Sequence, residues 1–166
     1  GWSRALPKKS FDVKMRAEYG ATRLEYPLFQ ENDYDTYDGL ALRAGAEDFS
    51  RTSNEVVYKA HQEFGMQVDM QAYRPVVLLL NGQYWGIYNL MERKGADFVA
   101  SRHGAEGIDL IADWNRVIEG SYDAYQELVD FLNVNDIATD SVYAEVRERI
   151  SVRSLIDMWL LHVYTN

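Results

Sequence analysis

The sequence predicts an α+β fold, with strands concentrated in residues 1–93 and helices in residues 94–166. Near the N-terminus apolar and polar residues alternate, which is the period of a half-buried strand. Further along, two apolar runs flank an Asn-Gly pair, which is typical of a β-hairpin. In the second half, apolar residues recur three or four positions apart, as on one face of a helix. A chain of 166 residues fits a single domain with a substantial core.

The first predicted strand covers Ser10–Ala17, where Phe11 and the alternate residues after it form one apolar face. Leu40–Arg43 is a short second strand. Thr52–Glu55 then reads as a capping box, and the apolar residues after it have helical spacing. Gly65 is placed to end that helix, because glycine readily adopts the left-handed conformation of a helix C-terminus.

The hairpin is the clearest local signal in the chain. Val76–Leu80 is a continuous apolar run, and Gln83–Met91 returns after a two-residue turn. We expect a type I′ turn, because Asn81 and Gly82 both tolerate a positive φ. Gly86 lies inside the returning strand, where glycine indicates a bulge or a close backbone approach.

The second half is predicted to be mostly helical. A short helix over Lys94–Arg102 stops at Gly104, and Ile108–Ala112 is one more strand. Three further helices are indicated by apolar stripes over Tyr122–Leu132, Val142–Ile150 and Leu155–Tyr164. Ser121 is placed to cap the first of these, and the last is apolar nearly all round, which predicts a buried helix.

Composition excludes several classes of function. The chain has 17 Lys and Arg against 26 Asp and Glu, a net charge of −9. Such an acidic protein is unsuited to general DNA binding, where neutralisation of phosphates supplies most of the affinity, so we expect no nucleic-acid partner. There are no cysteines, which excludes disulfides, thiolate metal sites and cysteine nucleophiles. No apolar run approaches the roughly 20 residues of a membrane-spanning helix, so no span is expected.

Several common site motifs are missing from the sequence. Neither of the standard glycine-rich phosphate loops is present. The acidic segment Asp33–Gly39 has the wrong register for a calcium loop and reads as a solvated loop. The three histidines share no helix-face spacing and read as surface or core residues rather than metal ligands: His61, His103 and His162. We therefore expect no metal site among these residues.

Four features remain as candidates for a site. They are a basic cluster (Arg4, Lys8 and Lys9), a strand-end cation (Arg43), a crowded hairpin (Tyr84, Trp85 and Gly86) and a charged pair at its close (Glu92 and Arg93). By residue type alone, these side chains fit solvated strand ends and core aromatics better than they fit a binding site.

The same features, in order, resemble a known family. The opening Gly1–Phe11, which reads GWSRALPKKSF, is similar to the "G-x-S-R…P-K-K-S-F" start of the spore coat protein H (CotH) kinase family. The hairpin Leu80–Tyr88, which reads LNGQYWGIY, with Glu92 and Arg93 resembles its most recognisable segment. Weaker landmarks are Tyr19-Gly20, Tyr26–Phe29, Leu40–Arg43 with Asp48, and, in the family's helical part, Val117–Gly120 and Leu155–Asp157. The resemblance covers nearly the whole chain.

The resemblance implies a protein-kinase-like fold with an atypical nucleotide site. Members of the family transfer the γ-phosphate of ATP to serines of spore-coat proteins, and others are surface or secreted proteins or adhesins. It thus implies ATP and Mg²⁺ as cofactors, a Ser/Thr-rich coat or surface protein as substrate, and a spore-coat, cell-surface or secreted location. A non-catalytic surface or adhesion protein with the same fold is the alternative.

Kinase chemistry requires a cation on the phosphates and carboxylates on the metal. By analogy, Arg4, Lys8, Lys9 and Arg43 are the candidate phosphate cations. Glu92 would orient one of these cations, and Tyr84 and Trp85 of the hairpin would line one side of the adenine site. We therefore expect Lys8 or Lys9, Arg43 and Glu92 to converge, with one lysine of the pair pointing inward.

The family's aspartate motifs fall after the segment that resembles its buried helix. By this resemblance the catalytic aspartates lie downstream of Asn166, and no catalytic residue is expected within the 166 residues. We thus expect the chain to be a partial domain, with a strand-rich part over 1–93 and a helical part over 94–166, that transfers no phosphate by itself.

Overall fold

The computed structural model describes residues 5–45, 48, 50, 52–112 and 115–165. Its contacts divide the chain into two compact units. The sheet unit comprises Gly1–Thr52 and Gln71–Glu106, and the helical unit comprises Ser53–Met70 and Gly107–Asn166. Strands lie mostly in the N-terminal half and helices mostly in the C-terminal half, so the α+β prediction is confirmed.

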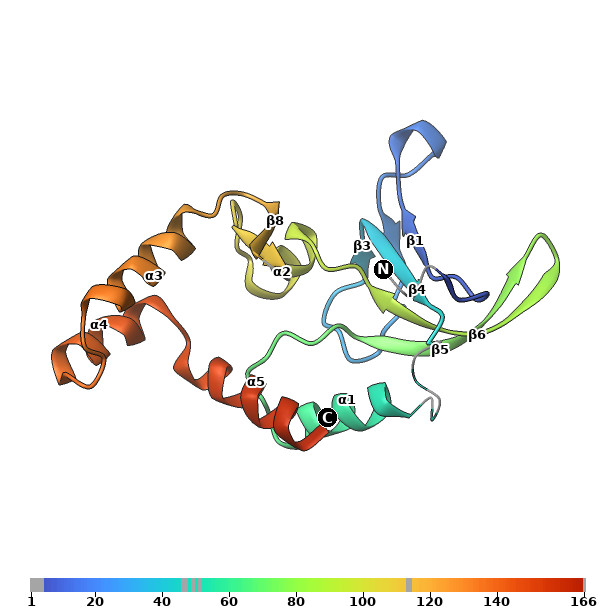
Figure 1. Cartoon of the computed structure of the whole chain (residues 1–166). Helices are drawn as coiled ribbons and strands as arrows, with labels where there is room; N and C mark the ends of the chain where they lie inside the picture. The colour runs from blue at the N-terminus through green and yellow to red at the C-terminus, as the bar shows by residue number, and fades with distance from the viewer. Residues whose placement is uncertain (1–4, 46–47, 49, 51, 113–114, 166) are drawn as a thin grey trace. The chain divides into compact units, whose positions relative to one another are not determined.

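The sheet unit is built on a four-stranded antiparallel sheet of order β1-β4-β6-β5 (Figure 1). Its strands are β1 (Phe11–Lys14), β4 (Gly39–Arg43), β5 (Tyr73–Leu80) and β6 (Gln83–Glu92). The unit also contains a small ladder of β2 (Leu24–Glu25) with β3 (Thr36–Tyr37), the 3-10 turn η2 (Ala17–Tyr19) and helix α2 (Ala96–His103). The first strand is shorter than predicted, and the β2–β3 ladder has no counterpart among the predictions.

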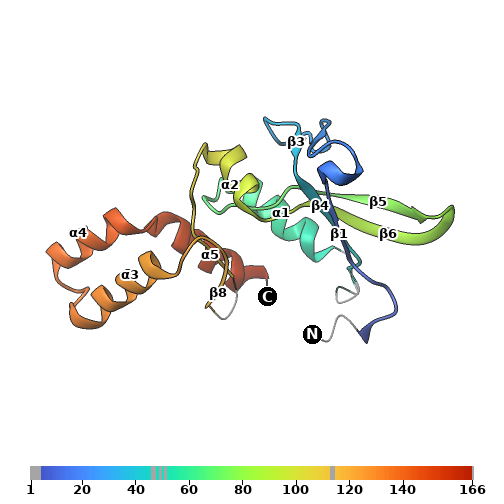
Figure 2. The same cartoon turned by 90° about the horizontal axis from the view of Figure 1, so that it is seen from above.

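The β5–β6 hairpin forms as predicted. Asn81 and Gly82 have φ values of 50° and 78°, the positive values that a type I′ turn needs at both central positions. Leu78 pairs with Gly86 and Leu79 with Tyr84, so Trp85 is the extra residue of a β-bulge. Beyond the last residue that pairs with β4, the hairpin continues as two strands alone (Figure 2).

The core of the sheet unit lies where the β2–β3 segment meets the sheet. Phe29, Tyr37, Leu40 and Ala72 form one buried cluster. The rings of Phe29 and Tyr37 meet edge to face with centroids 5.6 Å apart, a favoured aromatic geometry. This cluster supports the strand β6 segment that ends in Glu92, because Leu40 is the register partner of Glu92.

The helical unit contains α1, which lies beside α5 in both views (Figures 1 and 2). Its elements are α1 (Ser53–Glu63), β7 (Leu110–Ala112), β8 (Arg116–Glu119), α3 (Asp123–Val134), α4 (Asp140–Arg149) and α5 (Val152–Thr165). Strands β7 and β8 form an antiparallel pair. No helix among the described residues has both the length and the apolar character to cross a membrane.

Val117–Glu119, a landmark of the resemblance, lies in strand β8, which pairs with β7. One prediction for this half, the burial of its last helix, is wrong. Helix α5 forms, but it is not buried: of its residues only Asp157 and Leu161 are enclosed. Trp159 is 58% exposed. An apolar helix face is buried only where another segment packs against it. In the described structure α5 is buried only at Asp157 and Leu161, which lie one turn apart.

Asp157 joins α5 to the segment that follows α1. Its Oδ2 accepts the backbone N–H of Gln67 at 2.8 Å and the Nε–H of Arg153, one turn earlier, also at 2.8 Å. The Gln67 N–H, then Arg153, and to a lesser degree His61 lower the pKa of Asp157. His61 itself is fixed through Nε2, which lies 2.7 Å from the carbonyl oxygen of Val68.

Asp157 should make the stability of the helical unit depend on pH. A carboxyl whose folded-state pKa is depressed stabilises the fold above its unfolded pKa, 3.8, and loses that contribution as pH falls through the folded value. Asp157→Asn should therefore lower the melting temperature at pH 7, and the difference from the parent should shrink below pH 3.8. Circular-dichroism melts between pH 2 and 7 measure this. Glu148→Gln, at an exposed position, is the control, and a constant difference at every pH would contradict the expectation.

Candidate functional site

Lys8 is held on the face of the sheet. Its Nζ donates to the carbonyl of Ala44 at 3.0 Å and to that of Ile87, and it lies 4.3 Å from the centre of the Tyr88 ring. Lys9 instead is exposed and donates to Leu6 at 2.6 Å. One lysine of the pair thus points inward, as predicted, although Lys8 lies in a bend before β1 and not in a strand.

The Lys8–Ser10 segment makes hydrogen bonds to both backbone groups of Ala44, its C=O and its N–H. Lys8 donates to the Ala44 carbonyl, and Ser10 Oγ accepts the Ala44 N–H at 3.0 Å. Ala44 is only 3% exposed, and a buried peptide group needs both partners. This motif therefore has a structural role, holding the end of β4 in place, in addition to the charge that it brings.

The Tyr88 ring and Gly86 lie beside the Lys8 ammonium, and Phe11 joins Tyr88 to Trp85. Phe11 contacts Trp85 edge to face at 5.8 Å and Tyr88 at 6.1 Å between ring centroids. Gly86 has a φ of 107°, and a Cβ there would lie 3.7 Å from Lys8 Nζ. The Tyr88 hydroxyl is buried and has no hydrogen-bond partner within the described part of the chain, and burial raises its pKa. Lys8 and Trp85 are the two predicted site residues that the structure brings into one cluster.

The expected convergence of the lysine pair, Arg43 and Glu92 does not occur. Glu92 pairs with Leu40, and Arg43 lies three residues beyond Leu40 on the same strand. An odd separation along a strand places two side chains on opposite faces, so Arg43 and Glu92 point away from each other. Glu92 shares a face with Tyr88, the residue under Lys8, but lies four positions further along the strand, about 13 Å away.

Of the other predicted residues, Tyr84 is 67% exposed near the hairpin tip. Trp85 is 39% exposed despite its contact with Phe11. Arg4 lies outside the described residues. The predicted nucleotide contacts of these side chains remain predictions.

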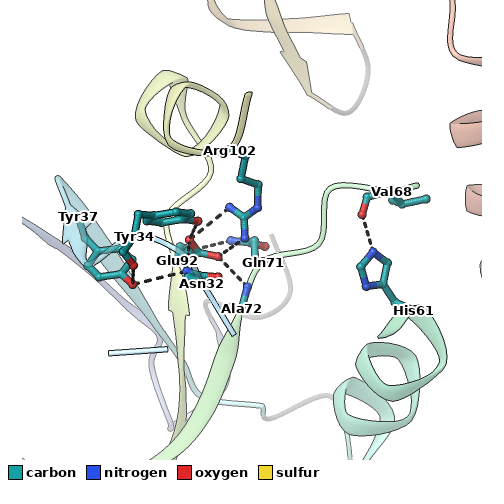
Figure 3. A network of polar contacts seen from close by, with 9 residues as sticks. All are labelled: Asn32, Tyr34, Tyr37, His61, Val68, Gln71, Ala72, Glu92 and Arg102. Atoms are coloured by element: carbon teal, nitrogen blue, oxygen red, sulfur yellow. Dashed lines mark hydrogen bonds and ion pairs between the residues drawn. The ribbon is translucent and has the colours of Figure 1, made fainter. Parts of the chain in front are cut away.

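Glu92 is the centre of a separate buried network (Figure 3). Its side chain is 3% exposed. Oε2 accepts bonds from Arg102 Nη2 at 2.6 Å and from the N–H of Ala72 at 2.7 Å. Oε1 accepts bonds from Arg102 Nη1 at 3.3 Å, Asn32 Nδ2 at 3.0 Å and the Tyr34 hydroxyl. The cation that Glu92 orients is therefore Arg102 on α2 and not a member of the basic cluster.

Sequence analysis did not single out Arg102 or Tyr34. Arg102 lies over the Phe98 ring at 3.8 Å, so its guanidinium is enclosed by an aromatic face as well as by the carboxylate. Burial, reinforced by the hydrogen bond to Glu92, raises the pKa of Tyr34 far above its usual range, which keeps the hydroxyl a donor. The spacing of Glu92 and Arg102, from a strand end to the next helix, carried no signal that would have revealed the pair.

The spaces near these residues are small. A cavity of about 10 Å³ lies beside Glu92, lined also by Tyr34, Tyr37 and Phe98, and it has room for about one water. A cavity of about 190 Å³ between Phe29, Glu31 and Arg74 includes none of the predicted site residues. Typical ligand pockets measure 300–1,000 Å³, so both of these cavities are smaller than a typical ligand site. The described residues contain no group of three His, Asp or Glu that could hold a metal ion.

Comparison with known families identifies the class of this protein. The family model described as CotH kinase protein matches residues 1–166, the whole chain. The chain therefore belongs to the CotH kinase family. No curated protein and no solved structure matches it significantly.

Proposed function

We propose that this chain is part of a CotH-type kinase that phosphorylates Ser or Thr of coat or surface proteins. In this proposal the chain binds the phosphates of the nucleotide. The observation that carries the proposal is the position of Lys8, a cation fixed on the open antiparallel sheet by two carbonyls and the Tyr88 ring. Family membership over the whole chain supports the same function.

The surroundings of Lys8 suit a phosphate contact. Phosphoryl transfer depends mainly on positioning and on neutralising charge, so a pre-oriented cation is of direct use. Gly86 lets the Lys8 side chain lie against the backbone of β6, because a Cβ there would come within 3.7 Å of Nζ. At about 4 Å near a protein surface, one such charge contributes about 4 kcal/mol of attraction to a phosphate oxygen before desolvation. This local contact must act against the net charge of −9.

In the proposed reaction a bond forms between the substrate hydroxyl oxygen and the γ-phosphorus. The bond from that phosphorus to the bridging oxygen breaks, ADP leaves with the electron pair, and the hydroxyl proton passes to a base. Mg²⁺, when bound, would neutralise charge on the phosphates. We assign neither the base nor a metal ligand to the described residues, and Lys8 holds the phosphate oxygens.

Replacing Lys8 by Met should weaken ATP binding at least about tenfold, because one fixed phosphate contact to a charged group contributes about 1.5–3 kcal/mol. Lys9→Met removes the same charge from the neighbouring exposed position and should change affinity less than about twofold. Isothermal titration with ATP, with and without Mg²⁺, measures both.

Ser10→Ala is the control that distinguishes the charge of Lys8 from its structural role. It removes the hydrogen bond between Ser10 and the Ala44 N–H but leaves the Lys8 ammonium in place. It should retain most of the ATP affinity. An equal loss in Ser10→Ala and Lys8→Met would contradict the phosphate assignment. Phosphate transfer from radiolabelled ATP to a serine-rich peptide, using the gene product that contains this chain, tests the activity. If neither binding nor transfer is found, the surface or adhesion function replaces the kinase.

A further inference from the structure

The turn of the β5–β6 hairpin contains the chain's single Asn-Gly pair, Asn81 and Gly82. The side-chain carbon Cγ of an asparagine is an electrophile, and the backbone nitrogen of the next residue can close a five-membered ring on it. A side chain on that next residue obstructs the approach. Glycine has none and its backbone rotates most freely, so Asn81 is by residue type the most reactive asparagine of the chain.

Both reacting groups are exposed and available in the structure. Asn81 and Gly82 lie on the surface, and the Asn81 side chain makes no hydrogen bond within the described part of the chain. The Gly82 N–H has no backbone partner there either. By contrast, the Asn135 side chain donates to the carbonyl of Phe131 at 2.8 Å. Neither the amide nor the nitrogen that would attack it is therefore held by another group.

The tip of the hairpin can open without unfolding the sheet. Residues 83–88 of β6 have no partner in β4, so the turn closes a two-stranded ribbon (Figure 2). Such a ribbon is marginally stable by itself. Val77 and Leu79 of this ribbon are each 61% exposed, so its opening costs little burial. Opening matters because ring closure requires the backbone between Asn81 and Gly82 to rotate out of the turn conformation.

We propose that Asn81 is a site of spontaneous deamidation. The Gly82 nitrogen loses its proton to solvent and forms a bond to Asn81 Cγ, the Cγ–Nδ2 bond breaks, and ammonia leaves after taking up a proton. Water then adds to either carbonyl carbon of the resulting succinimide and breaks the bond from that carbon to the ring nitrogen. Opening at Cγ gives aspartate, and opening at the backbone carbonyl gives isoaspartate. This inference does not depend on the proposed kinase function.

The two products differ in their effect on the hairpin. Aspartate before glycine suits a type I′ turn as asparagine does, so the first product keeps the pairing of Leu80 with Gln83. Isoaspartate runs the main chain through the side-chain carbon and lengthens the connection between the strands, so the two-residue turn is lost. Each product adds one negative charge to a chain of net charge −9.

Incubation of the protein from neutral to mildly alkaline pH, followed by peptide mass spectrometry, measures the modification. We expect deamidation at Asn81 that accelerates with pH, because the attacking nitrogen must lose its proton. Asn115 is the internal control, because it is also exposed, with a φ of 60°, but is followed by Arg116. Asn115 should react at least about tenfold more slowly, and Gly82→Ala should slow Asn81 by a similar factor. Equal rates at the two asparagines, or a rate unaffected by Gly82→Ala, would overturn the proposal.

Two further measurements test the route and the product. Glu92→Gln weakens the sheet unit away from the ribbon, so it should leave the rate at Asn81 within about twofold of the parent. Labelling by an isoaspartyl methyltransferase should detect the isoaspartate form. Amide hydrogen exchange over residues 76–88 should be faster in that form than in Asn81→Asp, which carries the charge without the rearranged backbone. Reaction of Asn81 only in urea, a rate raised severalfold by Glu92→Gln, or unchanged exchange in the isoaspartate form would contradict the inference.

Discussion

Replacing Glu92 by Ala should lower the free energy of unfolding of the sheet unit by about 3–5 kcal/mol, the usual cost of removing one partner of a buried ion pair. The carboxylate accepts bonds from Arg102, Asn32, Tyr34 and the N–H of Ala72. Its loss leaves the Arg102 guanidinium, whose side chain is 17% exposed, without its counter-charge. Urea denaturation followed by far-ultraviolet circular dichroism measures the change.

A double-mutant cycle with Arg102→Ala isolates the ion pair from the rest of the network. The double variant should lose less stability than the sum of the two single variants, because each single change alone leaves an unpaired buried charge. Glu92→Gln should be less damaging than Glu92→Ala, since its amide oxygen still accepts hydrogen bonds. Glu18→Ala, at an exposed position, should lie within about 0.5 kcal/mol of the parent. A loss for Glu92→Ala below about 1 kcal/mol would show that the network does not hold the sheet unit together.

Replacing Gly120 by Ala should cost the helical unit roughly 2–5 kcal/mol, as the sum of a backbone penalty and a steric one. Gly120 has a φ of 73°, and an added Cβ would lie 2.7 Å from the carbonyl oxygen of Ile108 and 2.1 Å from Asp109 Oδ1. That Oδ1 accepts the N–H of Ser121 at 2.6 Å. The methyl group would thus displace the carboxylate that holds Ser121, two residues before the start of helix α3.

Gly107 is the matched control for the steric part of this effect. It lies in the same unit with a φ of 65° and has nothing within 4 Å of an added Cβ. Gly107→Ala should therefore cost only the backbone penalty, about 1–2 kcal/mol. Thermal and urea unfolding of the two variants measure the difference. Equal losses in both would show that the segment near Ile108 shifts freely, contrary to the expectation.

Local sequence patterns predicted those elements whose determinants lie within a few residues of one another. The Asn81-Gly82 turn is specified by two residues that tolerate a positive φ, and both adopt one. Gly104 ends α2 in the left-handed conformation, with a φ of 63°. The bulge at Trp85 was indicated by Gly86, because glycine within a strand often marks such a site.

Elements that depend on distant partners were predicted less well. Strands β2, β3 and β8 are two to four residues long and exist only because another segment pairs with them, so periodicity over such lengths carries little information. Helix α5 was predicted to be buried because its sequence is apolar, but burial is a property of what packs against it. Helix α1 follows the first strands in sequence, yet it lies in the unit that contains α5.

The sequence by itself determined the α+β class, the hairpin, the family and the candidate residues, because periodicity, turn chemistry and motif order are local properties of the chain. Only the tertiary structure decided which charges meet. Strand register places Arg43 and Glu92 on opposite faces, and the chain after β6 brings Arg102, ten residues further on, to the Glu92 carboxylate. Register and packing are set by contacts between segments far apart in sequence, and no short pattern records them.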